Sequence, residues 1–248
     1  MKTASSRTEH TPNRVAHKAT QNAAIDVGLV LGTLLTLKYA LLSVEALWTY
    51  AGPISLLSAL AVANWRLRQG GESWADLGLE RPQSWRKTVV WTLAALILTT
   101  AAGILFETFV SAALGDAATR AEPGNIGRFT DLPGNTVAFI YWLAVAWIIG
   151  GFSEEMLFRG LLITRLETLF AHFPFGLIIA IILPALLFGQ QHFYYQGIGG
   201  AFATGGVALV SGILYLLFRR NLWPMILSHG LANTVGLTLI YAGLQPAG

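Results

Sequence analysis

Residues 136–160 read TVAFIYWLAVAWIIGGFSEEMLFRG, an apolar run that ends in two adjacent glutamates and an arginine. An α-helix needs about 20 mainly apolar residues to cross the roughly 30 Å hydrocarbon core of a bilayer. Carboxylates inside such a run are costly unless they have a partner, a wet cavity or a chemical task. This stretch therefore predicts a membrane-spanning helix that carries functional groups.

Similar apolar runs occur along most of the chain. Hydrophobic residues make up 54% and charged residues 12% of the 248 residues, whereas soluble domains carry about 25% charged residues. The runs lack the short alternation of an outer-membrane barrel. We expect an all-α, polytopic transmembrane helical bundle of about seven spans, within a range of roughly six to eight. The expected spans are approximately 24–50, 54–65, 88–114, 136–151, 173–192, 200–218 and 222–242.

The ends and loops indicate domain organisation and orientation. Residues 1–23 are polar and lack the apolar core of a signal peptide, so we interpret them as a disordered tail before one membrane-embedded domain, 24–248. Basic residues cluster in this tail, in the loop 66–87 and at Arg219 and Arg220, which predicts a cytoplasmic N-terminus. Short loops without extra domains favour a prokaryotic plasma membrane. The net charge of +3 is thinly spread, so no nucleic-acid partner is expected, and the absence of cysteine excludes thiol catalysis.

Ionisable side chains of the second half gather at three places, the first of which follows the quoted apolar run. Glu155 and Arg159 are spaced i,i+4, so they share a helix face and can pair. Glu154 is turned by about 100° and stays unpaired. We expect the Glu155–Arg159 pair to be structural or accessory and Glu154 to be the reactive carboxylate.

The other two places supply imidazoles and an amide. His192 lies about 18 residues after the helix break at 172–174 and Glu154 about 18 residues before it, so both should lie at the same depth. His229 and Asn233 are spaced i,i+4 and can donate to one oxygen atom. Hydrolysis of a peptide bond needs a base, a proton for the leaving amine and donors to the oxyanion. We assign the first two tasks to Glu154 with His192 and the third to His229 with Asn233.

The motifs Glu-Glu-x-x-x-Arg, Phe-x-x-x-His and His-x-x-x-Asn, in this order on successive apolar segments within about 135–242, resemble those of the CAAX endopeptidase and bacteriocin-processing (CPBP, or Abi) family of intramembrane proteases. The resemblance implies that Glu154 is the catalytic glutamate, which activates a water molecule. It also implies roles for both histidines, Asn233, Glu155 and Arg159. The implied substrates are membrane-associated proteins or peptides, from prenylated C-terminal tails to bacteriocin-type peptides, and some members act in immunity.

Several alternatives stay open. Glu154, His192 and His229 form a two-histidine, one-carboxylate set that is typical of some catalytic zinc sites, although no His-Glu-x-x-His motif is present. We expect no cofactor and keep zinc as the alternative. A non-catalytic immunity or transport protein is the rival of a different class. Ser211 lacks the Gly-x-Ser-Gly setting of a rhomboid-type nucleophile, and paired aspartates are missing after Asp131.

Three further polar features of the sequence bear on its structure. Lys38 and Glu45 are spaced i,i+7, which predicts a pair or a shared contact on one helix face. Ser73 followed by Asp76 indicates a capping pair for a short interfacial helix. Glu107 has no evident partner, and both a boundary position and a cavity position stay open for it.

Overall fold

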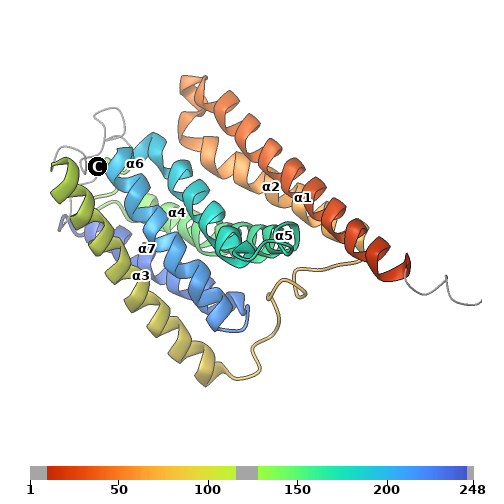
Figure 1. Ribbon diagram of the computed structural model, residues 1–248. Helices are drawn as coiled ribbons and strands as arrows, with labels where there is room; N and C mark the ends of the chain where they lie inside the picture. The colour runs from red at the N-terminus through yellow and green to blue at the C-terminus, as the bar shows by residue number, and fades with distance from the viewer. Residues whose placement is uncertain (1–9, 116–127, 245–248) are drawn as a thin grey trace, which may run out of the picture.

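The computed structural model describes residues 10–115 and 128–244, and within these ranges the chain is helical without strands. The predicted all-α fold is therefore confirmed. Figure 1 shows how the helices are arranged around a central crossing. The helices are α1 (His10–Leu42), η1 (Glu45–Tyr50), α2 (Ala51–Gly70), α3 (Trp85–Leu114), α4 (Thr136–Val145), η4 (Ala146–Ile163), α5 (Thr164–Leu169), α6 (Gly176–Leu217) and α7 (Leu222–Tyr241).

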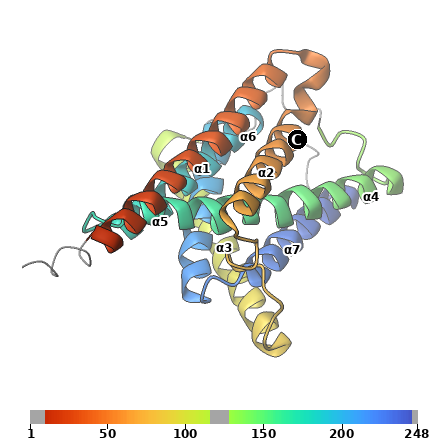
Figure 2. The ribbon, with the colours of Figure 1, turned by 90° about the vertical axis from the view of Figure 1, so that its right-hand side faces the viewer.

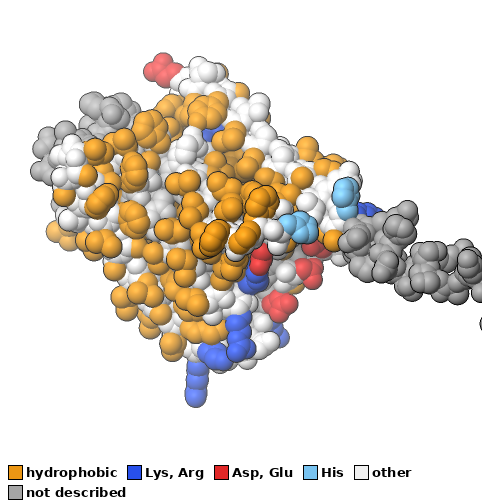
Figure 3. All heavy atoms as spheres, in the orientation of Figure 1, with side chains coloured by type: hydrophobic (Ala, Val, Ile, Leu, Met, Phe, Trp, Pro, Cys, Tyr) orange, Lys and Arg blue, Asp and Glu red, His pale blue; other side chains and the backbone are white. Residues whose placement is uncertain are grey.

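The outer surface of the bundle is apolar. Large hydrophobic side chains remain exposed on most helices, among them Ile97, Leu105 and Phe109 of α3. Figure 3 shows hydrophobic side chains over the middle of one face and Lys and Arg side chains gathered at its lower edge. Five helical stretches among the described residues are long and apolar enough to span a membrane. The protein is thus a multi-pass membrane protein, and the total of about seven spans stays a prediction.

A continuous helix, Thr136–Leu169, runs through the middle of the bundle and contains α4, η4 and α5 (Figure 2). Its first half is the predicted span 136–151, which continues for a further 18 residues. All residues from 155 to 163 are buried, as expected for a helix that is surrounded by other helices. This central helix therefore holds the two glutamates inside the protein.

The segment η4 has π-helical hydrogen bonding, with each N–H bonding five residues back. The hydroxyl of Ser153 follows the same pattern and donates to the carbonyl of Ile148 at 2.7 Å. A π-helix has a wider turn than an α-helix, so consecutive side chains diverge by less than the 100° assumed from the sequence. Glu154 and Glu155 consequently face more similar directions than an α-helix would allow.

Helix α6 is a hairpin of two helical arms. Gly197 breaks it with φ 66° and ψ −168°, a conformation that L-residues with a side chain rarely adopt. The arms lie close together, because a Cβ atom on Gly189 would be only 2.3 Å from the carbonyl oxygen of Ala201. The two predicted spans 173–192 and 200–218 correspond to these arms.

The backbones of α7 and η4 also lie close together where the two helices cross. A Cβ atom on Gly151 would lie 3.2 Å from the Cα atom of Gly230, and one on Gly230 would lie 2.5 Å from the ring of Trp147. Glycines let helix backbones approach in a membrane, where packing rather than hydrophobic exclusion drives helix association. This crossing brings the third motif against the first.

Ion pairs join the two halves of the bundle at the middle of α1. Asp26 is 3% exposed and accepts hydrogen bonds from Nε of Arg66 at 2.7 Å and from Nε of Arg165 at 2.8 Å. Arg165 also pairs with Glu72. These contacts connect α1, α2 and α5, and none of them was predicted from the sequence.

Two local expectations are corrected. Helix α1 begins at His10, so residues 10–23 of the expected disordered tail are helical, and residues 1–9 lie outside the described part of the chain. Ser73 does donate to Asp76 through its hydroxyl and its backbone N–H, and these bonds lower the pKa of the Asp76 carboxyl. The segment nevertheless forms turns rather than a helix, because Gly78 has φ 97° and its carbonyl accepts from the N–H of Leu222.

Candidate active site

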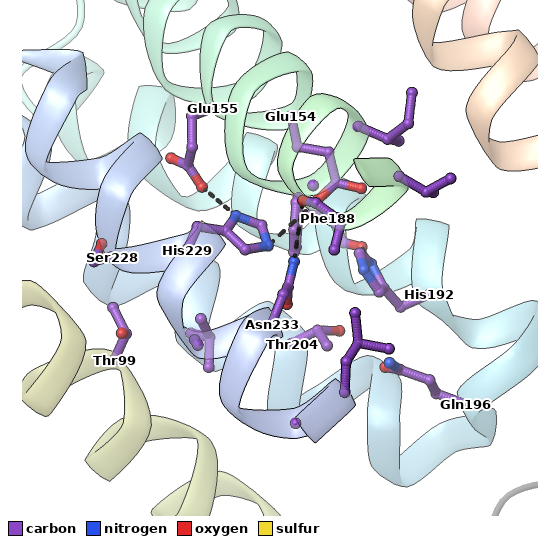
Figure 4. A pocket seen from close by; sticks show the side chains of 18 of the residues that line it. Thr99, Glu154, Glu155, Phe188, His192, Gln196, Thr204, Ser228, His229 and Asn233 are labelled. Atoms are coloured by element: carbon purple, nitrogen blue, oxygen red, sulfur yellow. Dashed lines mark hydrogen bonds and ion pairs between the residues drawn. The ribbon is translucent and has the colours of Figure 1, made fainter. Parts of the chain in front are cut away.

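A cavity of about 400 Å³ lies among η4, both arms of α6 and α7, with α3 and α4 at its sides. Figure 4 shows the side chains of the three motifs around it. The structure thus brings together residues that are up to about eighty positions apart in the chain. The residues predicted for the site that line the cavity are Glu154, Glu155, Arg159, His192, His229 and Asn233.

Glu155 is the buried member of the two glutamates. It is 1% exposed and lies 3.1 Å from Nη1 of Arg159, so the expected i,i+4 ion pair is present. Its Oε1 atom also accepts a hydrogen bond from Nδ1 of His229 at 2.8 Å. The second contact was not expected, and it gives Glu155 a direct part in orienting a site histidine.

Glu154 has fewer partners and more space. Its Oε2 atom lies 3.8 Å from Nε2 of His229, and the two side chains are 18% and 22% exposed. No hydrogen bond to Glu154 is present among the described residues. A partly accessible carboxylate beside a cavity is available to bind and deprotonate water.

The contacts of His229 fix its ring orientation. Because the carboxylate of Glu155 is an acceptor, Nδ1 of His229 carries a hydrogen, and Nε2 of the neutral ring is then an acceptor. In the imidazolium form Nε2 carries a hydrogen too, and the carboxylates on both sides of the ring compensate its charge. His229 therefore acts as a donor toward the cavity only while it is protonated.

His192 is held from its own helix. Its Nδ1 atom lies 2.8 Å from the carbonyl oxygen of Phe188, which can only accept, so Nδ1 is the donor and Nε2 is left free. The ring of Phe188 packs between the two histidines, with centroid distances of 4.5 Å to His192 and 6.4 Å to His229. Phe188 is 3% exposed, so its ring packs in the interior beside the site.

Asn233 lies beside His229 in space left by Gly150, a glycine that the sequence alone did not single out. Nδ2 of Asn233 donates to the carbonyl of Ala146 at 3.5 Å. A Cβ atom on Gly150 would lie 2.6 Å from this nitrogen and 3.5 Å from Nε2 of His229. Gly150 therefore leaves the space in which the amide and the imidazole lie side by side.

The comparison with known families agrees with this geometry. Residues 136–235 match the family described as type II CAAX prenyl endopeptidase Rce1-like. Over this segment the chain is similar to the CAAX endopeptidase family. No curated protein and no solved structure gives a match. The matched segment contains all three motifs, and this similarity, together with the apolar helices, supports a membrane-embedded peptidase.

Lys38 lies next to the candidate site, and the contact predicted for it from the sequence was wrong. Its expected pairing with Glu45 is absent, since α1 ends at Leu42 and Glu45 is exposed on η1. The ammonium is 3% exposed and donates to the carbonyl and to Oε1 of Gln191, the residue before His192.

A small cavity of about 70 Å³ separates Lys38 from the main site. Glu154 and His192 line this cavity too, so the amino group of Lys38 lies behind both residues. Glu107, for which two positions were open, is exposed on α3 and does not line the main cavity.

The described residues offer no preformed metal site, because no group of three His, Asp or Glu side chains is close enough to hold one ion. One nitrogen of each histidine is occupied, in His192 by a carbonyl and in His229 by a carboxylate. Such second contacts also orient histidines that bind metals. The donor set is therefore chemically suitable for zinc, but its geometry in the structure does not fit one ion.

Proposed function

We propose that this protein is an intramembrane endopeptidase that hydrolyses a peptide bond of a membrane-associated protein or peptide, with Glu154 activating the water. The observation that carries the proposal is the convergence of Glu154, His192, His229 and Asn233 on one cavity inside an apolar helical bundle. Prenylated C-terminal tails and bacteriocin-type peptides are the substrate classes that the family suggests.

The reaction begins with a water molecule between Glu154 and His192. The ionised carboxylate of Glu154 takes one proton while the oxygen attacks the carbonyl carbon of the scissile bond. His192 accepts a hydrogen bond from this water at Nε2 and orients it. The attack converts the carbonyl oxygen into an oxyanion.

Nδ2 of Asn233 and Nε2 of protonated His229 donate to this oxyanion, and the Glu155 carboxylate orients the His229 ring through Nδ1. When the intermediate collapses, the C–N bond breaks and the leaving nitrogen takes the proton that Glu154 received. The products are a carboxylic acid and an amine, and Glu154 returns to its ionised form.

The proposal includes the setting of the enzyme. Basic residues at the start of the chain and in the loop between α2 and α3 support a cytoplasmic N-terminus, because such residues are retained on that side. The short connections between helices support a prokaryotic plasma membrane. The partners are then the lipid bilayer and a substrate that reaches the cavity from it.

The test uses the purified full chain in lipid nanodiscs with a membrane-anchored peptide, and new termini are identified by mass spectrometry. Metal content is measured on the same sample, and the assay is repeated with zinc chelators. We expect cleavage that persists in protein without zinc. Loss of cleavage with the metal and its return with added zinc would support the metalloprotease alternative. Binding of the peptide without any cleavage would support a non-catalytic role.

A further inference from the structure

Three exposed cations lie together at one end of the bundle, away from the candidate active site. We call them the basic corner: Arg86 and Lys87 at the start of α3, and Arg219 in the turn between α6 and α7. Figures 1 and 2 show both places at the lower end of the bundle. Lys and Arg side chains gather at this lower edge in the space-filling view as well (Figure 3). The fold thus brings together charges from distant parts of the chain.

A stack of two aromatic rings connects the two places. The rings of Trp91 and Phe218 lie 4.9 Å apart between centroids, with their planes only 4° from parallel. Nζ of Lys87 lies 5.8 Å from the centre of the Trp91 ring, and Arg219 directly follows Phe218 in the chain. The two cations are therefore attached to the two members of one ring stack, and their long side chains can reach a shared ligand.

The turn that carries Arg219 is held rigidly. Arg219 and Arg220 have φ values of 57° and 60°, which residues with a side chain rarely adopt. Their backbone N–H groups donate to carbonyls near the end of α6 at 3.0 and 2.7 Å. A Cβ atom on Gly78 would collide with the carbonyl oxygen of Arg220, so the loop before α3 packs directly on the turn. The side chain of Arg220 pairs with Glu167, which leaves Arg219 as the outward cation of the turn.

No carboxylate compensates the basic corner. Within the described part of the chain, Arg86, Lys87 and Arg219 form no ion pair. Glu80, on the loop before α3, is exposed and pairs with none of them. Like charges that lie close together repel each other. The ligand that this arrangement favours is therefore an anion.

Two tryptophans beside the basic corner indicate where that anion comes from. The rings of Trp85 and Trp223 lie 6.4 Å apart between centroids, and Nε1 of Trp223 donates to the carbonyl of Glu80 at 2.8 Å. Tryptophan is enriched at the headgroup level of a bilayer. The corner should therefore lie among lipid headgroups, and anionic headgroups are concentrated in the cytoplasmic leaflet, the side predicted for this loop and turn.

We propose that the basic corner binds the phosphate of an anionic phospholipid, and that this lipid stabilises the folded bundle. The guanidinium of Arg219 can form two parallel N–H···O bonds with phosphate oxygens, and Lys87 adds a donor from another helix. The lipid would thereby join the start of α3 to the turn that leads into α7, the helix of His229 and Asn233. This inference does not depend on the proposed peptidase function.

The test measures thermal unfolding of the purified full chain in nanodiscs of zwitterionic phosphatidylcholine with rising fractions of anionic phosphatidylglycerol. The wild type should unfold about 5 °C or more higher in the mixed nanodiscs, because a ligand of the folded state stabilises it. Native mass spectrometry counts the phosphatidylglycerol that stays bound. Lys87→Gln and Arg219→Gln should each weaken this binding about fivefold, the effect of one charge near a membrane surface, and should reduce the gain in unfolding temperature.

Two further variants separate a lipid site from effects on folding or on general surface charge. Arg219→Gly also removes the guanidinium, but glycine tolerates the φ of 57°, so this variant should be at least as stable as the wild type in pure phosphatidylcholine. Arg68→Gln is the matched control, because Arg68 is an exposed arginine of α2 that forms no ion pair with the described residues. It lies outside the corner and should leave lipid binding unchanged.

Equal lipid binding and equal stabilisation of the wild type, Arg219→Gly and Lys87→Gln would overturn the inference. An equal loss in Arg68→Gln would overturn it too, because diffuse attraction to an anionic surface would then explain the effect. Stabilisation of the same size by inorganic phosphate in pure phosphatidylcholine nanodiscs would assign the corner to a dissolved anion instead. None of these measurements uses a peptide substrate, so their outcome is independent of cleavage.

Discussion

Replacing Gly150 with alanine should impair catalysis through one methyl group. The new Cβ atom would lie 2.6 Å from Nδ2 of Asn233, and side-chain contacts below 3.0 Å essentially do not occur. The amide must therefore move by several tenths of an ångström or more, away from its position beside His229. Loss of one donor to an oxyanion typically lowers kcat about 10²- to 10³-fold. We expect a decrease near the lower end of this range, with a small change in KM.

The assay measures kcat per folded molecule in nanodiscs, together with the thermal unfolding of each sample. Alanine favours a helix over glycine by roughly 0.5–1 kcal/mol, which partly offsets the steric strain, so Gly150→Ala should remain folded. Gly236→Ala is the matched control, because Gly236 also lines the cavity but a Cβ atom added there would have nothing within 4 Å. A kcat for Gly150→Ala within about threefold of the control would refute the role of Asn233 as an oxyanion donor.

Three further substitutions test the surrounding contacts. Arg159→Met leaves the buried carboxylate of Glu155 without the arginine that pairs with it, which should cost about 3–5 kcal/mol of stability. The yield of folded protein should therefore fall more than its turnover. Normal thermal unfolding with lost turnover would instead assign Arg159 a part in catalysis. Asp26→Asn removes a carboxylate that pairs with two arginines and does not line the main cavity, so chemical denaturation should show a loss of about 1–3 kcal/mol while kcat stays unchanged. Lys38→Met removes both hydrogen bonds to Gln191, which is the residue before His192. The substitution should therefore lower kcat about tenfold without raising KM. An unchanged kcat would limit Lys38 to packing.

Much of the fold follows from hydropathy alone. Apolar runs of membrane-spanning length predict helices, and the runs found in the sequence correspond to α1, α3 and the arms of α6. The number of membrane crossings does not follow from hydropathy, because the sequence does not show whether a break such as Gly197 separates two spans or bends one helix back on itself. Hydropathy also does not show how far the helix continues after 136–151, because polar residues interrupt the apolar run although they lie in the middle of a helix.

The sequence predicted which residues would lie together around one cavity, but it did not predict the contacts between them. Spacing along one helix predicted the Glu155–Arg159 pair, which is local. The bond from His229 to Glu155 depends on the close crossing of two helices and on the wide turn of η4, and neither feature has a simple sequence signal. The sequence did not single out Gly150, and only the position of Asn233 gives it a functional interpretation.

Glu154 is the residue on which the whole mechanism depends, and its isosteric replacement gives the most direct measurement. Glu154→Gln keeps the size of the side chain but cannot accept a proton from water. We predict that purified, folded Glu154→Gln cleaves a membrane-anchored peptide at least about 10²- to 10⁴-fold more slowly than the wild type, the range expected for loss of a general base. Cleavage within a few-fold of the wild-type rate at equal thermal stability would contradict the mechanism.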